Sequence, residues 1–348
     1  MLVLAAESSC DETAVALVED GRVLSSAVYS QVARHAPFGG IVPDIAARMH
    51  IETVAEVARR AFEEAERTPD QVDAVAATYA PGLVNCLVVG LSWARAFAVA
   101  RGLPFLAVDH LEAHVYGCLM SPLGDPLDPD KVELPLVALL VSGGHTAIYR
   151  YEGPGRMTRL ARTVDDAAGE AFDKVAVLLG LGYPGGPEIE RAAREGDPKA
   201  FDFPRGRIKR RPLDFSFSGL KTAVLYATRG QNKKRDDPLL PGLSIPDVAA
   251  SFQESVCRTL IDHAVKATLE QDVATLALAG GVARNGRLRE LALAAGDKKG
   301  LDIVLCEPAY CTDNAAMIGG LACARLAGGE APDRGQLALG ASSKSQVG

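Results

Sequence analysis

The sequence has few of the features that mark secreted, membrane or P-loop proteins. Its seven cysteines are an odd number and include no CxxC pair, which argues against a disulfide framework and favours a reducing compartment. The opening MLVLAAESSC has no basic segment before its short apolar run, so no signal peptide or membrane span is expected there. The pattern GxxxxGK[ST] is absent, which excludes a P-loop. We therefore expect a cytoplasmic protein with no membrane association.

Positive charge is scarce overall but locally concentrated. The net charge of −7 argues against broad nonspecific affinity for nucleic acid. Five of the seven residues of RGRIKRR, at 205–211, are nevertheless basic, and KKR follows at 233–235. Such a run is usually a solvated surface loop, but a local basic patch on an acidic protein can also contact a polyanion. Both interpretations stay open on the sequence.

Apolar periodicity predicts the same order of elements twice. Three strands are expected over 2–30, then a helix beginning at Pro43, a strand, a helix and a strand ending near His110. The order begins again at PLVALLVSGGH, so that Thr146 corresponds to Thr13. This duplication predicts an α/β protein with two lobes and a cleft between them. The expected division is 1–130, 131–330 with an insertion at about 165–245, and a tail over 331–348.

Glycine-rich turns follow two strands of the second predicted lobe. In VSGGHTA, Gly143 and Gly144 would let backbone amides approach an anion, although a tight hairpin would also explain the pair. AGGVARN, which ends at Asn285, opens a helix with a second glycine turn that suits a phosphate or a ribose. The elbow YPGGP, at 183–187, indicates a loop shaped around a ligand. These turns together favour a nucleotide-like ligand.

Two histidines lie four residues apart in VDHLEAHVYG. This spacing places the imidazoles of His110 and His114 on one face of the helix expected there. The corresponding position of the second lobe holds YCTDNAAM, so Asp313 is expected to join the pair from the other side of the cleft. Two histidines and one carboxylate suit iron(II) or zinc and leave coordination positions open. The alternative is a helix-capping role for the three residues.

The same segment resembles a zinc-protease box, but its spacing is wrong for one. In HExxH the general base directly follows the first histidine. Here Leu111 holds that position, and Glu112 is turned away around the helix at about 100° per residue. A metallopeptidase is therefore the least favoured enzyme hypothesis.

Nine motifs resemble those of one family and run in its order over 1–325. They are ESSCDETAVA, FGGIVPDIAARMH, HLEAH, LLVSGGHT, DDAAGEAFDK, YPGGP, DFSFSGLKTA, GGVARN and CTDNAAMI. The chain thereby resembles the TsaD family of tRNA threonylcarbamoyladenosine transferases, in its bacterial branch. The resemblance implies an actin-like, sugar-kinase-type (ASKHA) fold. It also implies transfer of a threonylcarbamoyl group from threonylcarbamoyl-AMP to the exocyclic amine of the adenosine 3′ of the tRNA anticodon.

The resemblance further implies roles for particular residues. The expected metal ligands are His110, His114 and Asp313, with Fe(2+) favoured over Zn(2+). Because the adenine amine is a poor nucleophile, Asp11 and Glu12 are the candidate catalytic or orienting carboxylates. The residues expected to contact the donor are Leu140, Val141, Ser142, Gly143, Gly144, Asp173, Gly186, Glu190 and Asn285.

Partners are also implied by the resemblance. Besides tRNA, the bacterial system is expected to need a smaller metal-free paralogue (TsaB), a small ATPase (TsaE) and a separate synthase that makes the donor. We expect the paralogue to dock on the apolar stripe of the helix at 44–66, unless that stripe packs on its own lobe. The stripe consists of Ile45, Met49, Val54, Val57 and Ala61.

Two other classes of protein remain as alternatives. A small-molecule kinase or ATPase of the same fold would need a Mg²⁺-binding acidic loop, which two imidazoles do not provide. A noncatalytic binding module that keeps the nucleotide cleft as a scaffold would be expected to have lost the metal ligands. The complete set of predicted ligands therefore favours the transferase.

Overall fold

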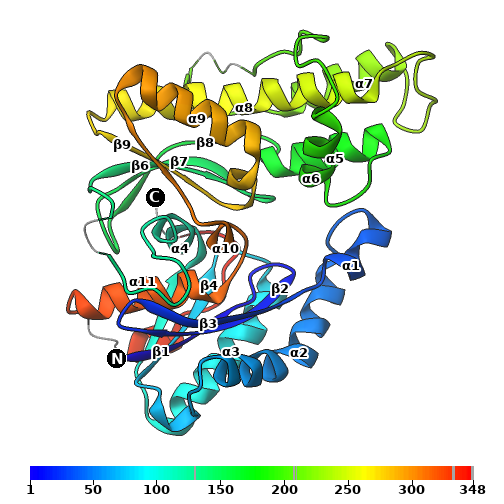
Figure 1. The fold of residues 1–348 in the computed structure, drawn as a ribbon. Coiled ribbons are helices and arrows are strands. Elements are labelled where there is room, and N and C mark those ends of the chain that lie inside the picture. The colour runs from blue at the N-terminus through cyan, green and yellow to red at the C-terminus, as the bar shows by residue number, and fades with distance from the viewer. Residues whose placement is uncertain (129–130, 207, 209, 331–333, 346–348) are drawn as a thin grey trace. The chain divides into compact units, whose positions relative to one another are not determined.

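Two five-stranded sheets with the same strand order form the framework of the chain (Figure 1). The computed structural model describes residues 1–128, 131–206, 208, 210–330 and 334–345. Its contacts divide the chain into two units. The first comprises Met1–Glu133, Glu152–Met157 and Cys306–Gly348, and the second comprises Leu134–Tyr151 and Thr158–Leu305.

The sheet of the first unit has the order β3-β2-β1-β4-β5. Its strands are β1 (Leu2–Glu7), β2 (Glu12–Glu19), β3 (Arg22–Ser30), β4 (Ala74–Ala80) and β5 (Phe105–Asp109). The first three pair antiparallel, and β1, β4 and β5 pair parallel. Because parallel strands end at the same edge of a sheet, the ends of β1, β4 and β5 bring the segments that follow them together.

Helices cover both faces of this sheet. They are α2 (Pro43–Glu64), α3 (Val84–Arg101), α4 (His110–Tyr116) and α11 (Ala315–Ala327). Side chains alternate along a strand, so Leu2 and Leu4 of β1 enter the core shared with α2 and α3. Ala5 and Glu7 point to the other face, where α11 packs on β1 and β2. Glu7 is thereby the one charged residue of a strand that is otherwise wholly apolar.

The second unit repeats this plan. Its sheet has the order β10-β9-β6-β7-β8, in which β6 pairs antiparallel with β7 and parallel with β9. The strands are β6 (Leu136–Val141), β7 (Thr146–Tyr151), β8 (Met157–Arg162), β9 (Thr275–Ala279) and β10 (Asp302–Leu305). The main helices are α5 (Ala168–Leu179), α6 (Gly185–Ala193), α7 (Ser218–Arg229), α8 (Ile245–Glu270) and α9 (Gly286–Lys299). The duplicated α/β organisation predicted from the sequence is confirmed.

The division of the chain differs from the predicted boundaries at its C-terminal end. Residues 306–348 belong to the first unit, although the sequence analysis assigned 306–330 to the second lobe and the rest to a tail. The reason is the close packing of α11, since a Cβ added at Gly319 would lie 2.7 Å from Val18 Cγ2 and 3.2 Å from Ala5 Cβ. The turn Glu152–Met157 joins the first unit as well.

The apolar stripe predicted on α2 is for the most part internal. Val57 and Ala61 are buried in the core of their own unit, and Val54 is buried as well. Ile45 and Met49 are half-buried. The exposed apolar side chain of this helix is Ile51, which is 66% exposed. Among the described helices α3 alone is long and apolar enough to cross a membrane by length and composition, and it packs on β1 and β4.

Candidate functional site

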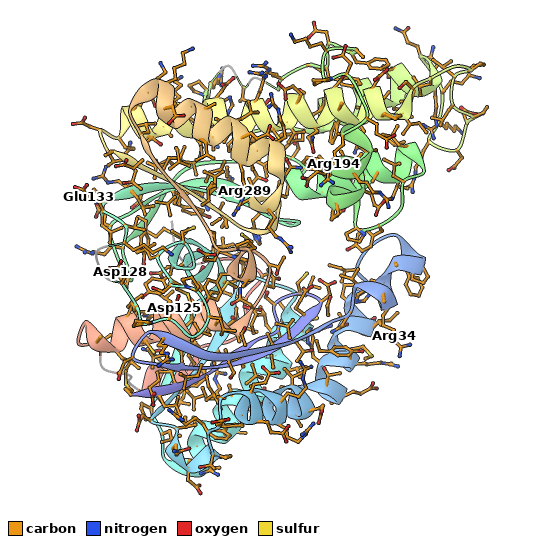
Figure 2. All side chains as sticks on the ribbon, in the orientation of Figure 1. Arg34, Asp125, Asp128, Glu133, Arg194 and Arg289 are labelled. Atoms are coloured by element: carbon orange, nitrogen blue, oxygen red, sulfur yellow. The ribbon has the colours of Figure 1, made fainter. Side chains whose placement is uncertain are left out.

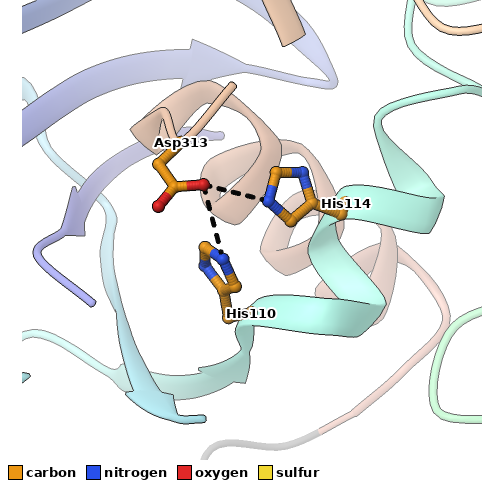
Figure 3. A group of neighbouring side chains, drawn as sticks. All are labelled: His110, His114 and Asp313. Carbon is orange, nitrogen blue, oxygen red and sulfur yellow. Dashed lines mark hydrogen bonds and ion pairs between the residues drawn. The ribbon is translucent and has the colours of Figure 1, made fainter. Parts of the chain in front are cut away.

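The predicted metal ligands lie together in the first unit. His110 and His114 lie one turn apart on α4, with their ring centroids 4.5 Å apart. Asp313 lies in the turn between α10 (Pro308–Cys311) and α11, and its carboxylate points at both rings (Figure 3). Asp313 Oδ1 is 3.2 Å from His114 Nε2 and 3.5 Å from His110 Nε2. One ligand atom from each residue falls within 4.8 Å of the others, so these three residues, here called the metal group, could hold one ion.

Glu7 holds the first histidine of the metal group in place. Its side chain is fully buried, and Oε2 accepts hydrogen bonds from His110 Nδ1 at 2.9 Å and from Thr78 Oγ1 at 2.5 Å. Oε1 accepts from the Ser9 backbone N–H. Because a carboxylate accepts, His110 donates through Nδ1 and directs Nε2 towards Asp313. The sequence analysis missed Glu7, although an acidic residue ending an apolar strand was a usable signal.

Burial and charge shift the acid–base properties of this group. Burial lowers the pKa of His110, but the carboxylates of Glu7 and Asp313 outweigh it and raise the pKa to about 9. The pKa of His114 is lowered, first by burial and then by the charge of His110. Burial opposes ionisation of Glu7 too, yet His110 holds the pKa of Glu7 below its usual value. A proton and a metal ion therefore compete for Nε2 of His110, because a metal is bound by the neutral imidazole.

The chemistry of these donors fits a divalent transition metal. Two imidazole nitrogens and one carboxylate oxygen are common ligands of iron and zinc, and three protein ligands leave coordination positions for a substrate. The carboxylate behind His110 is the outer partner that metal-bound histidines usually have. His114 Nδ1 is buried and has no hydrogen-bond partner within the described part of the chain. The alternative helix-capping role fails for His110 and His114, because Asp109 caps α4 with hydrogen bonds from Leu111 N and Glu112 N.

Residues 8–12, the acid loop, carry the two predicted catalytic carboxylates. Asp11 is buried and its backbone oxygen accepts from Gln31 N at 3.1 Å. Glu12 begins β2 and accepts from Ser30 Oγ at 3.2 Å. Burial, followed by the negative charges of Asp313 and Asp11, raises the pKa of Glu12 to about 10. Glu12 is therefore protonated near neutral pH in this environment, which makes it the weaker candidate for a base.

His50 of α2 holds the acid loop at Cys10 and contacts Thr13, the residue directly after the loop. Its Nε2 lies 3.0 Å from Cys10 O, which can only accept, so Nε2 carries the proton. Its Nδ1 then accepts from Thr13 Oγ1 at 2.7 Å. Burial lowers the pKa of His50, in keeping with this neutral form. The sequence analysis did not single out His50, although it closes the motif FGGIVPDIAARMH.

Glu112 does not belong to the metal group. It is buried, and its Oε1 accepts from Gly155 N at 2.6 Å, within the turn that joins the first unit. The carboxylate is thereby engaged away from His110 and His114, as the helical spacing predicted. This arrangement gives no support to a peptidase.

In the second unit, residues 142–145 form the glycine loop between β6 and β7. Gly143 and Gly144 are exposed, and a Cβ added at either would meet nothing within 4 Å. Internal packing therefore does not require glycine there, which leaves close approach of a ligand as a reason for it. Leu140 and Val141 are fully buried in β6, so only their backbone could contact a donor.

A second glycine supports this loop from behind. A Cβ at Gly169, in the first turn of α5, would lie 2.6 Å from Ser142 O and 2.7 Å from Gly143 Cα. The Gly169 N–H also donates to Ser142 O at 3.2 Å. The sequence analysis did not identify Gly169, and the small residues of DDAAGEAFDK were the available signal.

The other residues of the second unit that are predicted to contact threonylcarbamoyl-AMP form two groups. Asp173 Oδ1 accepts from Gly185 N at 2.7 Å, at the start of α6, where Gly186 is open to solvent on its Cβ side. Glu190 Oε1 accepts from Gly286 N at 3.1 Å, and Glu190 Oε2 lies 3.5 Å from Asn285 Nδ2.

Asn285 is largely occupied with protein contacts. Its Oδ1 caps α9 by accepting from Leu288 N at 3.0 Å, and its Nδ2 donates to Gln253 Oε1 at 2.8 Å. The turn before it, Gly281–Arg284, is held by Arg289, whose Nε donates to Ala283 O at 2.9 Å. Arg289 is labelled beside α9 in Figure 2. Asn285 therefore shapes the start of α9 in the described arrangement.

Comparisons with known proteins identify the family. The model of the TsaD family, described as tRNA N6-adenosine threonylcarbamoyltransferase, matches residues 22–320. The chain belongs to the TsaD family. A protein named tRNA N6-adenosine threonylcarbamoyltransferase in Geobacter sulfurreducens is 49% identical over 319 residues, covering 91% of this chain and 90% of the relative. Its namesake in Caldicellulosiruptor saccharolyticus is 47% identical over 319 residues, covering 91% of both. Membership of TsaD makes the chain an enzyme of tRNA modification.

Solved structures agree on the fold. The HypF protein of T. kodakarensis matches with a TM-score of 0.60 at 17% identity, over 94% of this chain and 48% of that longer one. The ROK hexokinase of Thermus thermophilus matches with a TM-score of 0.52 at 17% identity, over 94% of this chain and 99% of the hexokinase. At such identities the likeness concerns the fold alone. The predicted actin-like, sugar-kinase-type fold of this TsaD-family chain is confirmed.

Proposed function

We propose that this chain transfers the threonylcarbamoyl group of threonylcarbamoyl-AMP to N6 of the adenosine 3′ of the anticodon, in tRNAs that read codons beginning with adenine. The observation that carries the proposal is the metal group with its buried Glu7 support, in a chain that matches TsaD over residues 22–320. We further propose that the enzyme acts in the cytoplasm. None of its seven cysteines, all of which lie in the described part of the chain, forms a disulfide, which suits a reducing compartment.

The metal is proposed to be Fe(2+), with Zn(2+) as the alternative. His110 and His114 would bind it through Nε2, and Asp313 through its carboxylate. When bound, such an ion supplies a Lewis acid for donor oxygens. Glu7 keeps the His110 ring oriented for this role, because its Oε2 accepts the hydrogen bond from the Nδ1–H.

The donor is proposed to be held by backbone and side-chain groups of the second unit. The amides of Gly143 and Gly144 and the hydroxyl of Ser142 would donate to its phosphate and carbamoyl oxygens, because the Ser142 N–H is taken by His145 O. Leu140 and Val141 would contribute through their backbone alone. A second set of residues would hold the adenosine of the donor. Two of them are carboxylates, which can accept hydrogen bonds from the ribose hydroxyls. This set consists of Asp173, Gly186, Glu190 and Asn285.

The transfer step needs positioning and one proton acceptor. The adenine N6 forms a bond to the carbamoyl carbon, the bond from that carbon to the phosphate oxygen breaks, and AMP leaves with its electron pair. N6 loses one proton, which we assign to Asp11 because Glu12 is already protonated near neutral pH. Glu12 can donate a hydrogen bond instead and orient the substrates. AMP is a good leaving group, so little further help is required.

The partners are proposed to be tRNA, a TsaB-like paralogue and a TsaE-like ATPase. The tRNA would contact the basic loop at 205–211, of which Arg207 and Lys209 lie outside the described residues. Arg205 pairs with Asp262 and Arg211 with Asp214, while Arg210 is exposed. The paralogue would dock on exposed apolar side chains of α2 and α3, among them Ile51, Val84 and Val88.

A metal-content measurement combined with a transfer assay tests the proposal. The parent protein should carry close to one transition metal, and changing both His110→Ala and His114→Ala should remove it, because two of three ligands are lost. The same variant should form no modified nucleoside when supplied with donor, tRNA and partners. Full metal content in this variant would refute the metal group, whereas metal loss with unchanged transfer would refute its part in the reaction.

The structure does not favour a kinase or ATPase activity as a second function. The likeness to hexokinase concerns the fold alone, and the metal group has two imidazoles where a nucleotide-bound Mg²⁺ is met by carboxylates and water.

A further inference from the structure

The C-terminal segment 336–345 runs beside β5, the strand that leads into the metal-binding helix. Gln336 Oε1 accepts from Ala107 N at 2.9 Å, in the middle of β5. Arg95 donates to the backbone oxygens of Gln336 and Leu339. Leu337, Leu339 and Ala341 pack against the core of the first unit. The segment is thereby fixed to this unit at several points before it reaches the start of α4.

The segment ends on Asp109, the residue directly before His110. Ser342 N donates to Tyr79 O at 2.9 Å, at the end of the neighbouring strand β4. Three residues later, Ser345 Oγ donates to Asp109 Oδ2 at 2.7 Å. Asp109 is itself buried, so this hydrogen bond satisfies a carboxylate oxygen that water reaches poorly.

The two oxygens of Asp109 have different tasks. Oδ1 caps α4 by accepting from Leu111 N at 2.9 Å and from Glu112 N at 3.2 Å. Oδ2 receives Ser345, which fixes the rotation of the carboxylate that makes the cap. The helix α4 has only seven residues, and its first and fifth are His110 and His114. So short a helix depends on its cap and its packing for a defined start.

We propose that Ser345 is a positioning residue of the metal centre, acting through Asp109 on the orientation of α4. Ser345 is not one of the three residues of the metal group, and its hydroxyl donates to Asp109. It restrains the capping carboxylate and with it the first turn of the helix that presents both imidazoles. The inference rests on the metal site proposed above. Ser345 would thus contribute to the geometry of the metal site although it lies more than two hundred residues away in sequence from the histidines.

The experiment compares Co²⁺-loaded full-length parent, Ser345→Ala and Ser343→Ala. Ser343 is exposed and lies two residues from Ser345, so its change removes a hydroxyl of the same segment without touching Asp109. A strong chelator then strips the Co²⁺ while its visible absorption, which depends on ligand geometry, is recorded. Ser345→Thr keeps the hydroxyl and serves as the rescue variant.

Ser345→Ala should release Co²⁺ roughly three to ten times faster than the parent, less than the effect of losing a group bonded directly to a ligand. Its Co²⁺ spectrum should change, while Ser345→Thr and Ser343→Ala keep the parental rate and spectrum. The thermal midpoint of the metal-free Ser345→Ala protein should stay within about 3 °C of the parent.

Two outcomes would overturn the proposal for Ser345 alone, and a third would also overturn the metal site on which it rests. Parental release and spectrum in Ser345→Ala would show that the hydroxyl has no influence on the metal. An equal change in Ser343→Ala would show a general effect of the segment. Failure of the parent itself to bind Co²⁺ would instead refute the metal site, and Ser345 would lose its role with it.

Discussion

The loops that follow β1 and β6 occupy the same place in the two repeated sheets, yet they are built in opposite ways. The acid loop is buried and polar, with Ser8, Ser9 and Asp11 each at most 6% exposed. The glycine loop exposes Gly143 and Gly144 and offers mainly backbone. The loop of the first unit thus buries charged and polar side chains, whereas the loop of the second unit leaves the backbone amides of its glycines accessible.

This contrast explains why the two loops depend on different neighbours. Ser9 is in close contact with Gly82, in the turn between β4 and α3, and Ser8 with Gly90 of α3, since a Cβ at either glycine would collide with the serine. The glycine loop is supported from one side by Gly169 and closes on itself through Ser142 N and His145 O, 2.8 Å apart. Changes in the acid loop should therefore act on the chemical step, and changes in the glycine loop on donor binding.

The largest effect is expected for Asp11→Asn. The amide cannot accept the N6 proton, so kcat for threonylcarbamoyl transfer should fall by about 10²–10⁴-fold with little change in KM for the donor. Steady-state assays with purified partners measure both constants. Asp236→Asn, which changes an exposed carboxylate, is the matched control and should leave them unaltered. A parental kcat in Asp11→Asn would remove this residue from the chemical step.

The glycine loop should respond in the complementary way. Gly143→Val adds a side chain where the fold leaves space, so the protein should stay stable while KM for the donor rises by about tenfold. Gly169→Ala should instead lower the free energy of unfolding by about 1–3 kcal/mol, because its Cβ meets Ser142 O. Urea unfolding of both variants separates the two cases. Equal stability losses would mean that both glycines serve packing.

The smallest effect concerns pH and the support of the acid loop. Burial lowers the pKa of folded His50 below the ordinary value of 6.5, so below that pH the unfolded chain binds more protons than the folded one. His50 therefore stabilises the fold above pH 6.5, and this contribution is lost as pH falls through its lowered pKa. His50→Gln should show a smaller loss of unfolding free energy between pH 7.5 and 5.5 than the parent. Identical losses in urea titrations would exclude this linkage.

Periodicity and spacing predicted much of this molecule, because those signals are local. The repeated strands are apolar runs bounded by turns, and the i, i+4 histidines fix a helix face whatever surrounds it. Asp313 was expected to reach the histidines from the second lobe, across the cleft. The structure places it beside both histidines but within the first unit, because 306–348 belongs to that unit. Glu7 was missed because its partner, His110, is 103 residues away and no local pattern joins them.

The division of the chain was harder to predict for the same reason. The apolar residues of α11 show that the helix is buried, but not which sheet it packs on. Which sheet α11 packs on depends on the close fit of Gly319 against Ala5 and Val18. These residues are far apart in the sequence, so no local pattern shows the fit. The stripe of α2 is a similar case, since Val57 and Ala61 are equally suited to a partner and to their own core, and the core buries them. Asp173, Glu190 and Asn285 stay predictions as donor contacts.

The contacts of Ala107 also bear on how this protein avoids self-association. β5 is the outermost strand of its sheet, and a free strand edge is a template for pairing with another chain. Here the Ala107 N–H is taken by the Gln336 side chain, and Ala107 O accepts from Arg325 at 3.1 Å. An intruding strand would find the central donor and acceptor of this edge already used. Loss of the Gln336 side chain would leave the Ala107 N–H of this edge available to a strand of another chain, so the segment 336–345 also covers a strand edge.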